Sequence, residues 1–253
     1  MTREQTARRR KRLWIILGVL LAAILLVCAG FAVYVGDYYH ADETAVQAMA
    51  PADGIVTSKA DGDDLVFAPP SPKAGLIFYP GGKVEYTAYA PLMRACAERG
   101  ILCVLVKMPC NLAVLDMNAA DGIAEQYPDI DAWYIGGHSL GGAMAAAYAA
   151  DHSGELDGLI LLAAYSTKDL NGSGLEVLSV YGSEDRVLNR EKYEGYRGSL
   201  PAGAVEIVID GGCHAGFGSY GPQEGDGIPT ITGEEQVMRT ASEIADIVLG
   251  AGG

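Results

Sequence analysis

The sequence predicts one α/β domain with a mostly parallel central sheet, preceded by a single membrane-spanning helix. Three observations predict it: short apolar runs alternate with helical patterns, a G-x-S-x-G pentapeptide stands between such a run and a helix-forming run, and 23 consecutive residues near the N-terminus carry no charge. A chain of 253 residues is long enough to bury the core of one such domain.

The uncharged stretch, Leu13–Val35, would span about 34 Å as a helix, which exceeds a hydrocarbon core of about 30 Å. Six Arg and Lys residues within residues 1–12 indicate a cytoplasmic N-terminus by the positive-inside rule. A cleaved signal peptide is the alternative, but its apolar region is typically about 7–15 residues. A lipid-modified Cys28 is a weaker alternative, because Val27 precedes it. We therefore expect a single-pass anchor in the cell membrane with an extracytoplasmic domain.

Charge is unevenly distributed along the chain. The whole sequence has 18 Lys and Arg against 32 Asp and Glu, and residues 1–12 hold six of the basic and one of the acidic residues. Because residues 13–35 are uncharged, residues 36–253 have 12 basic and 31 acidic side chains, a net charge of −19. So acidic a region argues against nucleic acid as a partner. We expect residues 36–53 to form a polar stalk and residues 54–253 the domain.

Turn residues divide this domain into short elements. Ile55–Lys59 and Asp64–Ala68 are predicted to form a β-hairpin. The predicted strands of the parallel sheet are Ala74–Tyr79, Ile101–Val106, Ala132–Ile135, Leu159–Ala163, Leu175–Tyr181 and Val205–Asp210. The predicted helices are Tyr86–Arg99, Asn118–Tyr127, the run after Ser139, Leu188–Leu200 and Glu234–Leu249. The interval between Ala164 and Leu175 is too short for a cap domain, so we expect an open, shallow pocket.

The pentapeptide Gly137–Gly141 reads Gly-His-Ser-Leu-Gly and has the flanks of a nucleophile elbow. The apolar run Trp133–Ile135 precedes it, and an alanine-rich run follows it. Ser139 would stand on a tight turn with its hydroxyl exposed, and glycines two residues to either side would leave room for the neighbouring strand and helix. Such a short motif also occurs by chance, so its test is whether a base and an acid follow in order.

A serine nucleophile needs a general base, and His214 is the best placed of the four histidines. It follows the last predicted strand in a loop of small residues. His40 lies in the expected stalk, and His152 ends the helix that follows the elbow. His138 adjoins the serine, and we expect its ring to point away from the hydroxyl of Ser139.

Asp185 is the best candidate for the acid, because it directly follows the predicted strand Leu175–Tyr181. Glu184 is its nearest competitor, and Asp169 is a less well placed one. The carboxyl ends of parallel strands meet at one edge of a sheet, where active sites of such folds lie. The resulting order along the chain, Ser…Asp…His, is the order expected for a nucleophile elbow on this fold.

Two backbone N–H groups are expected to hold the oxyanion of an acyl substrate. One belongs to Leu140, at the N-terminus of the helix after the elbow. The other belongs to Gly82 in the glycine-rich turn after the strand Ala74–Tyr79, with the N–H of Lys83 in reserve. The side chains expected to contact the substrate are those of Lys83, Tyr86, Met108, Asn111 and Phe217. The sequence has no metal-ligand spacing, and the expected chemistry needs neither a metal nor a cofactor.

Four cysteines lie in the expected domain. Cys103 falls in an apolar strand and Cys96 in a predicted helix, so we interpret both as buried thiols. Cys110 and Cys213 lie in loops that the fold would bring to the same edge of the sheet. A disulfide bond between these two is a further hypothesis.

With these residues in hand, the chain resembles the alpha/beta hydrolase superfamily. More narrowly it resembles the small, lidless, dienelactone-hydrolase-like group called "alpha/beta hydrolase fold-5". The resemblance covers about Ile55–Leu249 and rests on segments 78–84, 136–142, 180–187 and 211–223. It implies Ser139 as nucleophile, Asp185 as acid and His214 as base. Cys213 stands where the family pattern has a polar residue, usually asparagine.

The expected activity is hydrolysis of a carboxylic ester, with a small-molecule or cell-envelope ester as substrate. Three alternatives remain open. The same residues could transfer the acyl group to an envelope sugar or lipid, they could cleave a peptide bond, or the domain could be a catalytically silent binding module. Neither the substrate nor the oligomeric state follows from the sequence.

Overall fold

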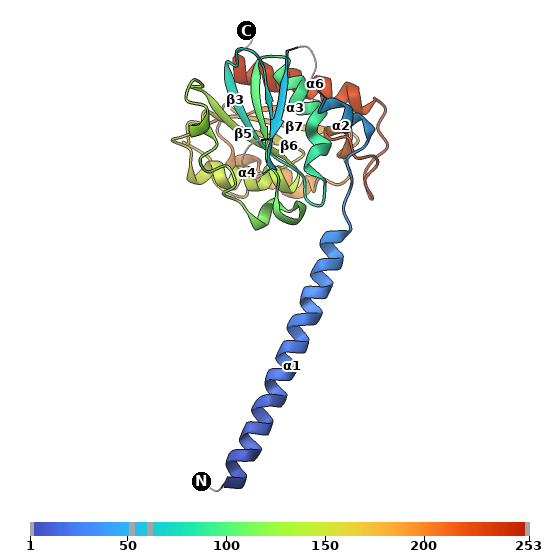
Figure 1. Cartoon of the computed structure of the whole chain (residues 1–253). Helices are drawn as coiled ribbons and strands as arrows, with labels where there is room; N and C mark the ends of the chain where they lie inside the picture. Colours follow the sequence, from blue (N-terminus) through green and yellow to red (C-terminus); the bar gives the residue numbers. More distant parts are fainter. Residues whose placement is uncertain (1–2, 51–53, 60–62, 251–253) are drawn as a thin grey trace. The chain divides into compact units, whose positions relative to one another are not determined.

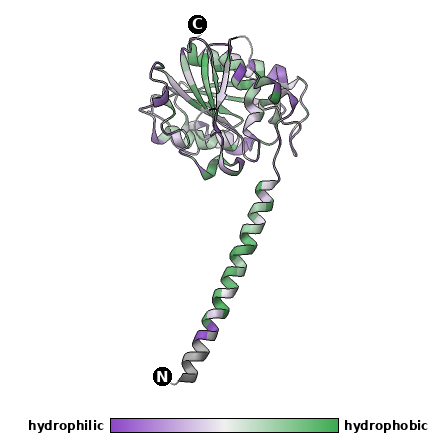
Figure 2. Ribbon diagram, in the orientation of Figure 1, coloured by the Kyte–Doolittle hydropathy of each residue, from purple (hydrophilic) through white to green (hydrophobic). Residues whose placement is uncertain are grey.

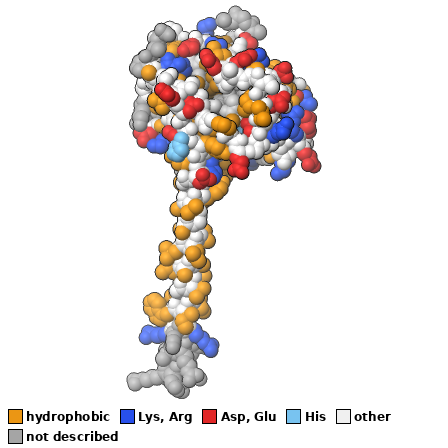
Figure 3. Space-filling view, turned by 90° about the vertical axis from the view of Figure 1, so that its right-hand side faces the viewer, with side chains coloured by type: hydrophobic (Ala, Val, Ile, Leu, Met, Phe, Trp, Pro, Cys, Tyr) orange, Lys and Arg blue, Asp and Glu red, His pale blue; other side chains and the backbone are white. Residues whose placement is uncertain are grey.

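The computed structural model describes residues 3–50, 54–59 and 63–250. The chain divides into two compact units, Met1–Tyr38 and Tyr39–Gly253. The first consists mainly of helix α1, Arg3–Gly36. The part of α1 from Arg12 to Gly36 is long enough and apolar enough to cross a membrane. A signal sequence can have the same length and composition. Hydrophobic side chains cover this stretch, and the exposed side chains of Arg10 and Arg12 lie toward its N-terminal end (Figures 2 and 3).

The second unit is built on an eight-stranded sheet (Figure 1). Its strands are β1 Val56–Lys59, β2 Leu65–Ala68, β3 Ala74–Tyr79, β4 Ile101–Leu105, β5 Trp133–His138, β6 Gly158–Leu162, β7 Glu176–Gly182 and β8 Val205–Ile209. The strand order is β1-β2-β4-β3-β5-β6-β7-β8. The β1–β2 hairpin joins β4 in antiparallel fashion, and all other pairs are parallel. The predicted hairpin and the predicted parallel strands are therefore confirmed.

Helices cover both faces of this sheet. The helices are α2 Glu43–Ala48, α3 Ala90–Ala97, α4 Leu140–Asp151, α5 Arg190–Tyr196 and α6 Gly233–Leu249. Single 3₁₀ turns lie at η2 Tyr86–Tyr89, η3 Pro109–Asn111, η4 Ala113–Leu115, η5 Ala124–Gln126, η6 Arg197–Ser199 and η7 Ala215–Phe217. Helices α3 and α6 pack together on one face, and α4 packs on the other (Figure 1). Only turns connect β6 to β7, so no cap is inserted there.

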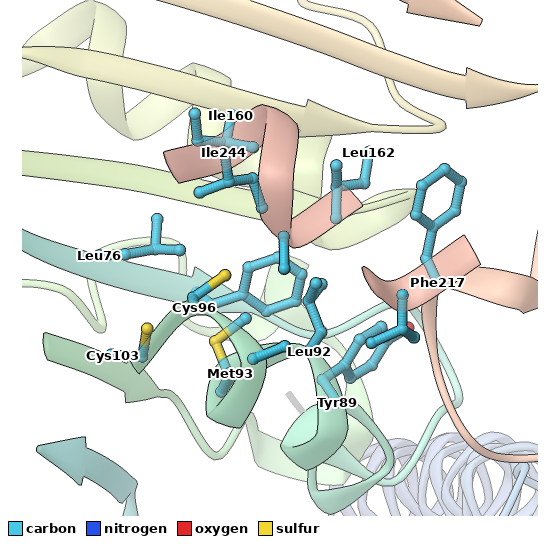
Figure 4. Packing of buried hydrophobic residues seen from close by; sticks show 14 of the residues in the cluster. Leu76, Tyr89, Leu92, Met93, Cys96, Cys103, Ile160, Leu162, Phe217 and Ile244 are labelled. Atoms are coloured by element: carbon cyan, nitrogen blue, oxygen red, sulfur yellow. The ribbon is translucent and has the colours of Figure 1, made fainter. Parts of the chain in front are cut away.

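The core consists of two main apolar clusters, one on each face of the sheet. All six residues of β3 are buried, as expected of a strand that is covered on both faces. Figure 4 shows Leu76 of this strand close to Cys96 of α3 and to Ile244 of α6. Cys96 and Cys103 are both fully buried, so the interpretation of these residues as buried thiols is confirmed.

Residues 39–50 do not form the polar stalk that we expected. Tyr39 N–H donates to the carbonyl of Lys83 (2.8 Å), and Glu85 N–H donates to the carbonyl of Tyr39 (2.8 Å). Asp42 caps helix α2, whose Ala45 is fully buried. Backbone pairing, the buried Ala45 and several partly buried side chains that pack on the core hold the segment, and their spacing gives no regular apolar periodicity in the sequence.

The helix predicted over Asn118–Tyr127 is also absent, and turns with the 3₁₀ segment η5 take its place. Gly122 has φ +74°, a left-handed conformation that interrupts a right-handed helix. The buried hydroxyl of Tyr79 accepts the N–H of Ala120 (2.9 Å) and donates to the carbonyl of Met117 (2.9 Å). A side chain from β3 thus satisfies backbone groups that a helix would have paired internally.

The disulfide bond proposed between Cys110 and Cys213 is wrong, because both cysteines are unpaired. Cys110 is exposed in the loop after β4, with φ 53°. Cys213 is buried beside Asp226. Burial and the negative charge of Asp226 raise the pKa of the Cys213 thiol to about 11, which disfavours the thiolate needed for disulfide exchange.

Candidate active site

Ser139 lies on the turn between β5 and α4, in the elbow (residues 137–141). Its φ of 52° and ψ of −119° place a non-glycine residue in a strained region of backbone space. The N–H of Ser139 donates to the carbonyl of Leu162 (2.9 Å), which ties the elbow to the end of β6. The serine side chain is half-buried, so it is accessible at the carboxyl end of the sheet.

The two glycines of the elbow are required by close backbone contacts. A Cβ at Gly137 would lie 2.6–2.7 Å from backbone atoms of Gly141, Gly142 and Tyr79. A Cβ at Gly141 would collide with the carbonyl oxygens of Tyr79 and Pro80. The predicted reason for these glycines, room for the neighbouring strand and helix, is confirmed.

His214 and Asp185 form a buried pair at the same edge of the sheet. His214 Nδ1 lies 2.9 Å from Asp185 Oδ2, and both side chains are almost completely buried. The other carboxylate oxygen accepts the N–H groups of Val187 (2.9 Å) and Leu188 (2.8 Å). Two backbone N–H groups of the acid loop (residues 183–188) thus fix the carboxylate of Asp185. With Nδ1–H donated to Asp185, the lone pair of the imidazole is left on Nε2.

The competing carboxylates lie elsewhere. Asp169 accepts the backbone N–H (3.0 Å) and the side-chain amide (2.9 Å) of Asn171 at the surface. Glu184 accepts the hydroxyl of Ser183 (3.2 Å). Of the carboxylates considered from sequence, Asp185 is therefore the one that reaches His214.

The ring of His214 packs against that of His138, the residue immediately before Ser139, with ring centroids 4.5 Å apart. Among the described residues, no hydrogen-bond partner reaches His214 Nε2, so it makes no hydrogen bond to the hydroxyl of Ser139. In enzymes without bound substrate this contact is often long and tightens only on binding. The fold thus packs the ring of His214 against the residue that precedes Ser139, without a hydrogen bond between the side chains of His214 and Ser139.

In the turn after β3, successive N–H groups differ in whether they are already hydrogen-bonded. Gly81 N–H donates to the hydroxyl of Tyr89 (3.1 Å), and Lys83 N–H donates to the carbonyl of Asn111 (2.8 Å). The N–H of Gly82, between them, has no acceptor in the described part of the chain. A Cβ at Gly82 would lie 2.8 Å from the side chain of Leu140, so the two predicted donors are neighbours. The N–H of Lys83 is already engaged and is no longer a reserve candidate.

Tyr89 and His138 connect the turn after β3 to His214. The sequence analysis did not predict this connection for either residue. Tyr89 is fully buried and its oxygen lies 2.7 Å from His138 Nδ1. The described residues offer its hydroxyl hydrogen no other acceptor, so the hydrogen bonds assign the proton of His138 to Nε2. Nε2 faces the backbone of His214 without reaching hydrogen-bond geometry. Burial, and then the charge of His214, hold the pKa of His138 well below its usual range, so this ring is neutral.

The residues expected to contact substrate divide into two groups. Phe217, labelled in Figure 4, is fully buried and packs on the ring of His138, and Met108 is buried in the core. Neither can line an open surface, so this prediction is wrong for both. Lys83, Tyr86 and Asn111 are half-buried, and their contact with substrate stays a prediction.

The groups that could act on a ligand are thus a serine, a buried imidazole–carboxylate pair and two backbone N–H groups. Within the described ranges, no three His, Cys, Asp or Glu side chains gather in a way that could hold a metal ion.

After Tyr89 and His138, Asp226 is a third residue near the site that the sequence analysis did not identify. Its carboxylate accepts the backbone N–H groups of His214 and Ala215. Asp226 lies 12 residues after His214 in a loop, and no sequence pattern there indicates that its carboxylate returns to the histidine.

Comparisons with known proteins agree with the fold. The model of the alpha/beta hydrolase family matches residues 75–238. Curated protein sequences give no match. Three similar solved structures are a predicted CIB-like hydrolase from Thermoplasma acidophilum, Est1E from Butyrivibrio proteoclasticus and a dienelactone hydrolase from Anabaena variabilis.

Their sequence identities to this chain are 16%, 14% and 12%, with TM-scores of 0.53, 0.56 and 0.57. The alignments cover 76%, 78% and 78% of this chain and 100%, 100% and 98% of the respective structures. At these identities the structures establish the fold alone. The family model matches more than half of the chain, and the chain therefore belongs to the alpha/beta hydrolase family.

Proposed function

We propose that the chain is a serine hydrolase that cleaves a carboxylic ester through an acyl-enzyme. The observation that carries this proposal is the buried His214–Asp185 pair, packed beside the strained elbow that presents Ser139. Strained backbone of this kind costs about 1–3 kcal/mol and clusters at functional sites. A buried imidazole–carboxylate pair beside a serine is the arrangement that activates a hydroxyl for attack on an acyl group.

In the proposed reaction, Nε2 of His214 accepts the proton of Ser139 while the serine oxygen attacks the ester carbonyl. The N–H groups of Leu140 and Gly82 stabilise the oxyanion, each by about 3–4 kcal/mol. Asp185 holds Nδ1–H and stabilises the imidazolium. The imidazolium then protonates the leaving alcohol as its bond to the acyl carbon breaks. In the second half, Nε2 takes a proton from a water molecule whose oxygen attacks the acyl carbon, and the imidazolium returns that proton to the oxygen of Ser139 as the acid is released.

Labelling with a fluorophosphonate tests this proposal on the full-length chain in detergent micelles. The wild-type chain should label covalently and hydrolyse short p-nitrophenyl esters. Ser139→Ala should abolish labelling and lower the hydrolysis rate by about 10⁴-fold or more. Ser58→Ala, which alters an exposed serine on the edge strand β1, should behave as wild type. Equal labelling of wild type and Ser139→Ala would contradict the proposal.

Product analysis distinguishes this activity from its alternatives. A hydrolase gives only the free acid when glycerol is added as an acceptor, whereas an acyltransferase gives a new ester. A panel of fluorogenic peptides tests for peptidase activity. Failure of the wild-type chain to label would favour a binding module.

We also propose that α1 anchors the chain in the cell membrane, with residues 1–12 in the cytoplasm and the domain outside. The basic residues that flank the apolar stretch on its N-terminal side support this orientation. Mass spectrometry of the chain from native membranes should find residues 1–12 intact. If the chain from membranes instead lacks its N-terminal residues and begins after residue 28, the apolar stretch is a cleaved signal sequence and the proposal of an anchor is wrong.

A further inference from the structure

Asp226 connects the two loops that carry the proposed base and acid. Its Oδ1 accepts the N–H groups of His214 (3.2 Å) and Arg186 (3.3 Å), and its Oδ2 accepts that of Ala215 (2.8 Å). A fourth donor is the N–H of its neighbour Gly227 (2.8 Å). One carboxylate therefore joins the histidine loop (residues 211–217) to the acid loop (residues 183–188).

This carboxylate is ionised at neutral pH. Burial opposes its ionisation, but the four backbone N–H donors outweigh burial and hold the pKa of Asp226 below its usual value. A carboxylate that accepts several backbone N–H groups forms charge-assisted bonds, which are stronger than neutral ones. Without Asp226, the N–H groups of His214, Ala215 and Arg186 would have no acceptor among the described side chains.

A cavity of about 700 Å³ lies against the histidine loop. Its wall includes Asp226 itself together with Cys213, Ala215 and Gly216 of the loop. Ile228, which also lines it, is 85% exposed, so the cavity is open to solvent. A small solute can therefore reach the place that the carboxylate occupies.

We propose that Asp226 is a positioning residue that sets the orientation of His214 relative to Asp185 and Ser139 by bonding the backbone of both loops. This inference rests on the proposed serine hydrolase activity. Asp226 itself touches neither Ser139 nor the ring of His214 through any hydrogen bond of the described residues. Its contribution is one of geometry, and a displacement of about 1 Å in a catalytic group can cost about 100-fold in rate.

The test compares Asp226→Ala and Asp226→Asn with wild type as full-length chains in detergent micelles. Asp226→Ala should lower kcat for a short p-nitrophenyl ester by about 100-fold while KM changes less than about threefold, because the substrate-binding surface is untouched. Sodium formate, which can occupy the vacated space from the cavity, should restore kcat at least about tenfold. Formate should not change wild type or the control Glu224→Gln, an exposed acid two residues away.

Amide hydrogen exchange gives a second readout that needs no activity. In Asp226→Asn, the amides of His214, Ala215 and Arg186 should exchange faster, whereas those of β5 and α4 should not. If either variant keeps kcat within about threefold of wild type, or if these three amides keep their wild-type protection, the inference is wrong. If Asp226→Ala does not fold, Asp226→Asn carries the same comparison. A wild-type chain that neither labels nor turns over ester contradicts the proposed function, and the amide exchange still decides the inference.

Discussion

The elbow and the histidine loop hold the two halves of one proposed reaction, but they are stabilised in opposite ways. The elbow is stabilised by close backbone packing. Its glycines have no side chains, so their backbone can lie directly against the backbone at the end of β3. The histidine loop is held by side chains that arrive from far along the sequence. Asp226 accepts its N–H groups, and the amide of Gln236 bonds both the N–H (3.0 Å) and the carbonyl (2.8 Å) of Cys213. A local motif therefore specifies the first, and only tertiary contacts specify the second.

The largest effect is expected where the elbow admits no side chain. Gly141→Ala puts a Cβ against the carbonyl oxygens of Tyr79 and Pro80, and should lower the free energy of unfolding by about 3 kcal/mol and remove ester hydrolysis. Urea denaturation followed by circular dichroism measures the change. Gly154→Ala, where no atom lies within 4 Å of the new Cβ, should be nearly neutral. Equal stability of the two variants would refute the backbone-contact explanation.

An intermediate effect is expected in the histidine loop. Gln236→Ala leaves the buried N–H and carbonyl of Cys213 without partners, which should cost about 2 kcal/mol of stability. Because the next residue is His214, kcat should also fall, by about tenfold. Met238→Ala, an exposed change on the same helix, serves as the control for both measurements. A variant with normal kcat would mean that the loop needs no support from α6.

The smallest effect is expected between the two regions, at Tyr89. Tyr89→Phe keeps the ring but leaves Gly81 N–H and His138 Nδ1 unpaired, at a cost of about 1 kcal/mol. Since Gly81 precedes the proposed donor Gly82, kcat should fall by about threefold with KM nearly unchanged. Tyr196→Phe, on the exposed face of α5, is the matched control. A rise in KM alone would place Tyr89 in substrate binding instead of oxyanion positioning.

Features that depend on neighbours in the sequence were predictable. The strands of the parallel sheet, the elbow and its glycines follow from apolar runs and turn residues. The pairing of Asp185 with His214 followed from the rule that loops at the carboxyl ends of parallel strands meet at one edge. Each of these needs only short segments and one topological rule.

Features that depend on distant partners were not predictable. The turns after Asn118 are held by the hydroxyl of Tyr79, and the segment from Tyr39 is held by backbone pairing beside Lys83. Phe217 looks like a pocket residue in a glycine-rich loop, yet the loop folds inward and buries it. That Cys110 is exposed while Cys213 is buried and both stay unpaired likewise depends on how their two loops fold.

The sequence by itself thus determined the order of elements, the elbow and the identity of the groups that could react, because local geometry and alternation along the chain specify them. Only the tertiary structure decided which N–H of the turn after β3 remains free for an oxyanion, and that Asp226 ties the histidine loop in place. Those choices depend on hydrogen bonds between residues far apart in the sequence, and no local pattern records which partner a buried polar group will find.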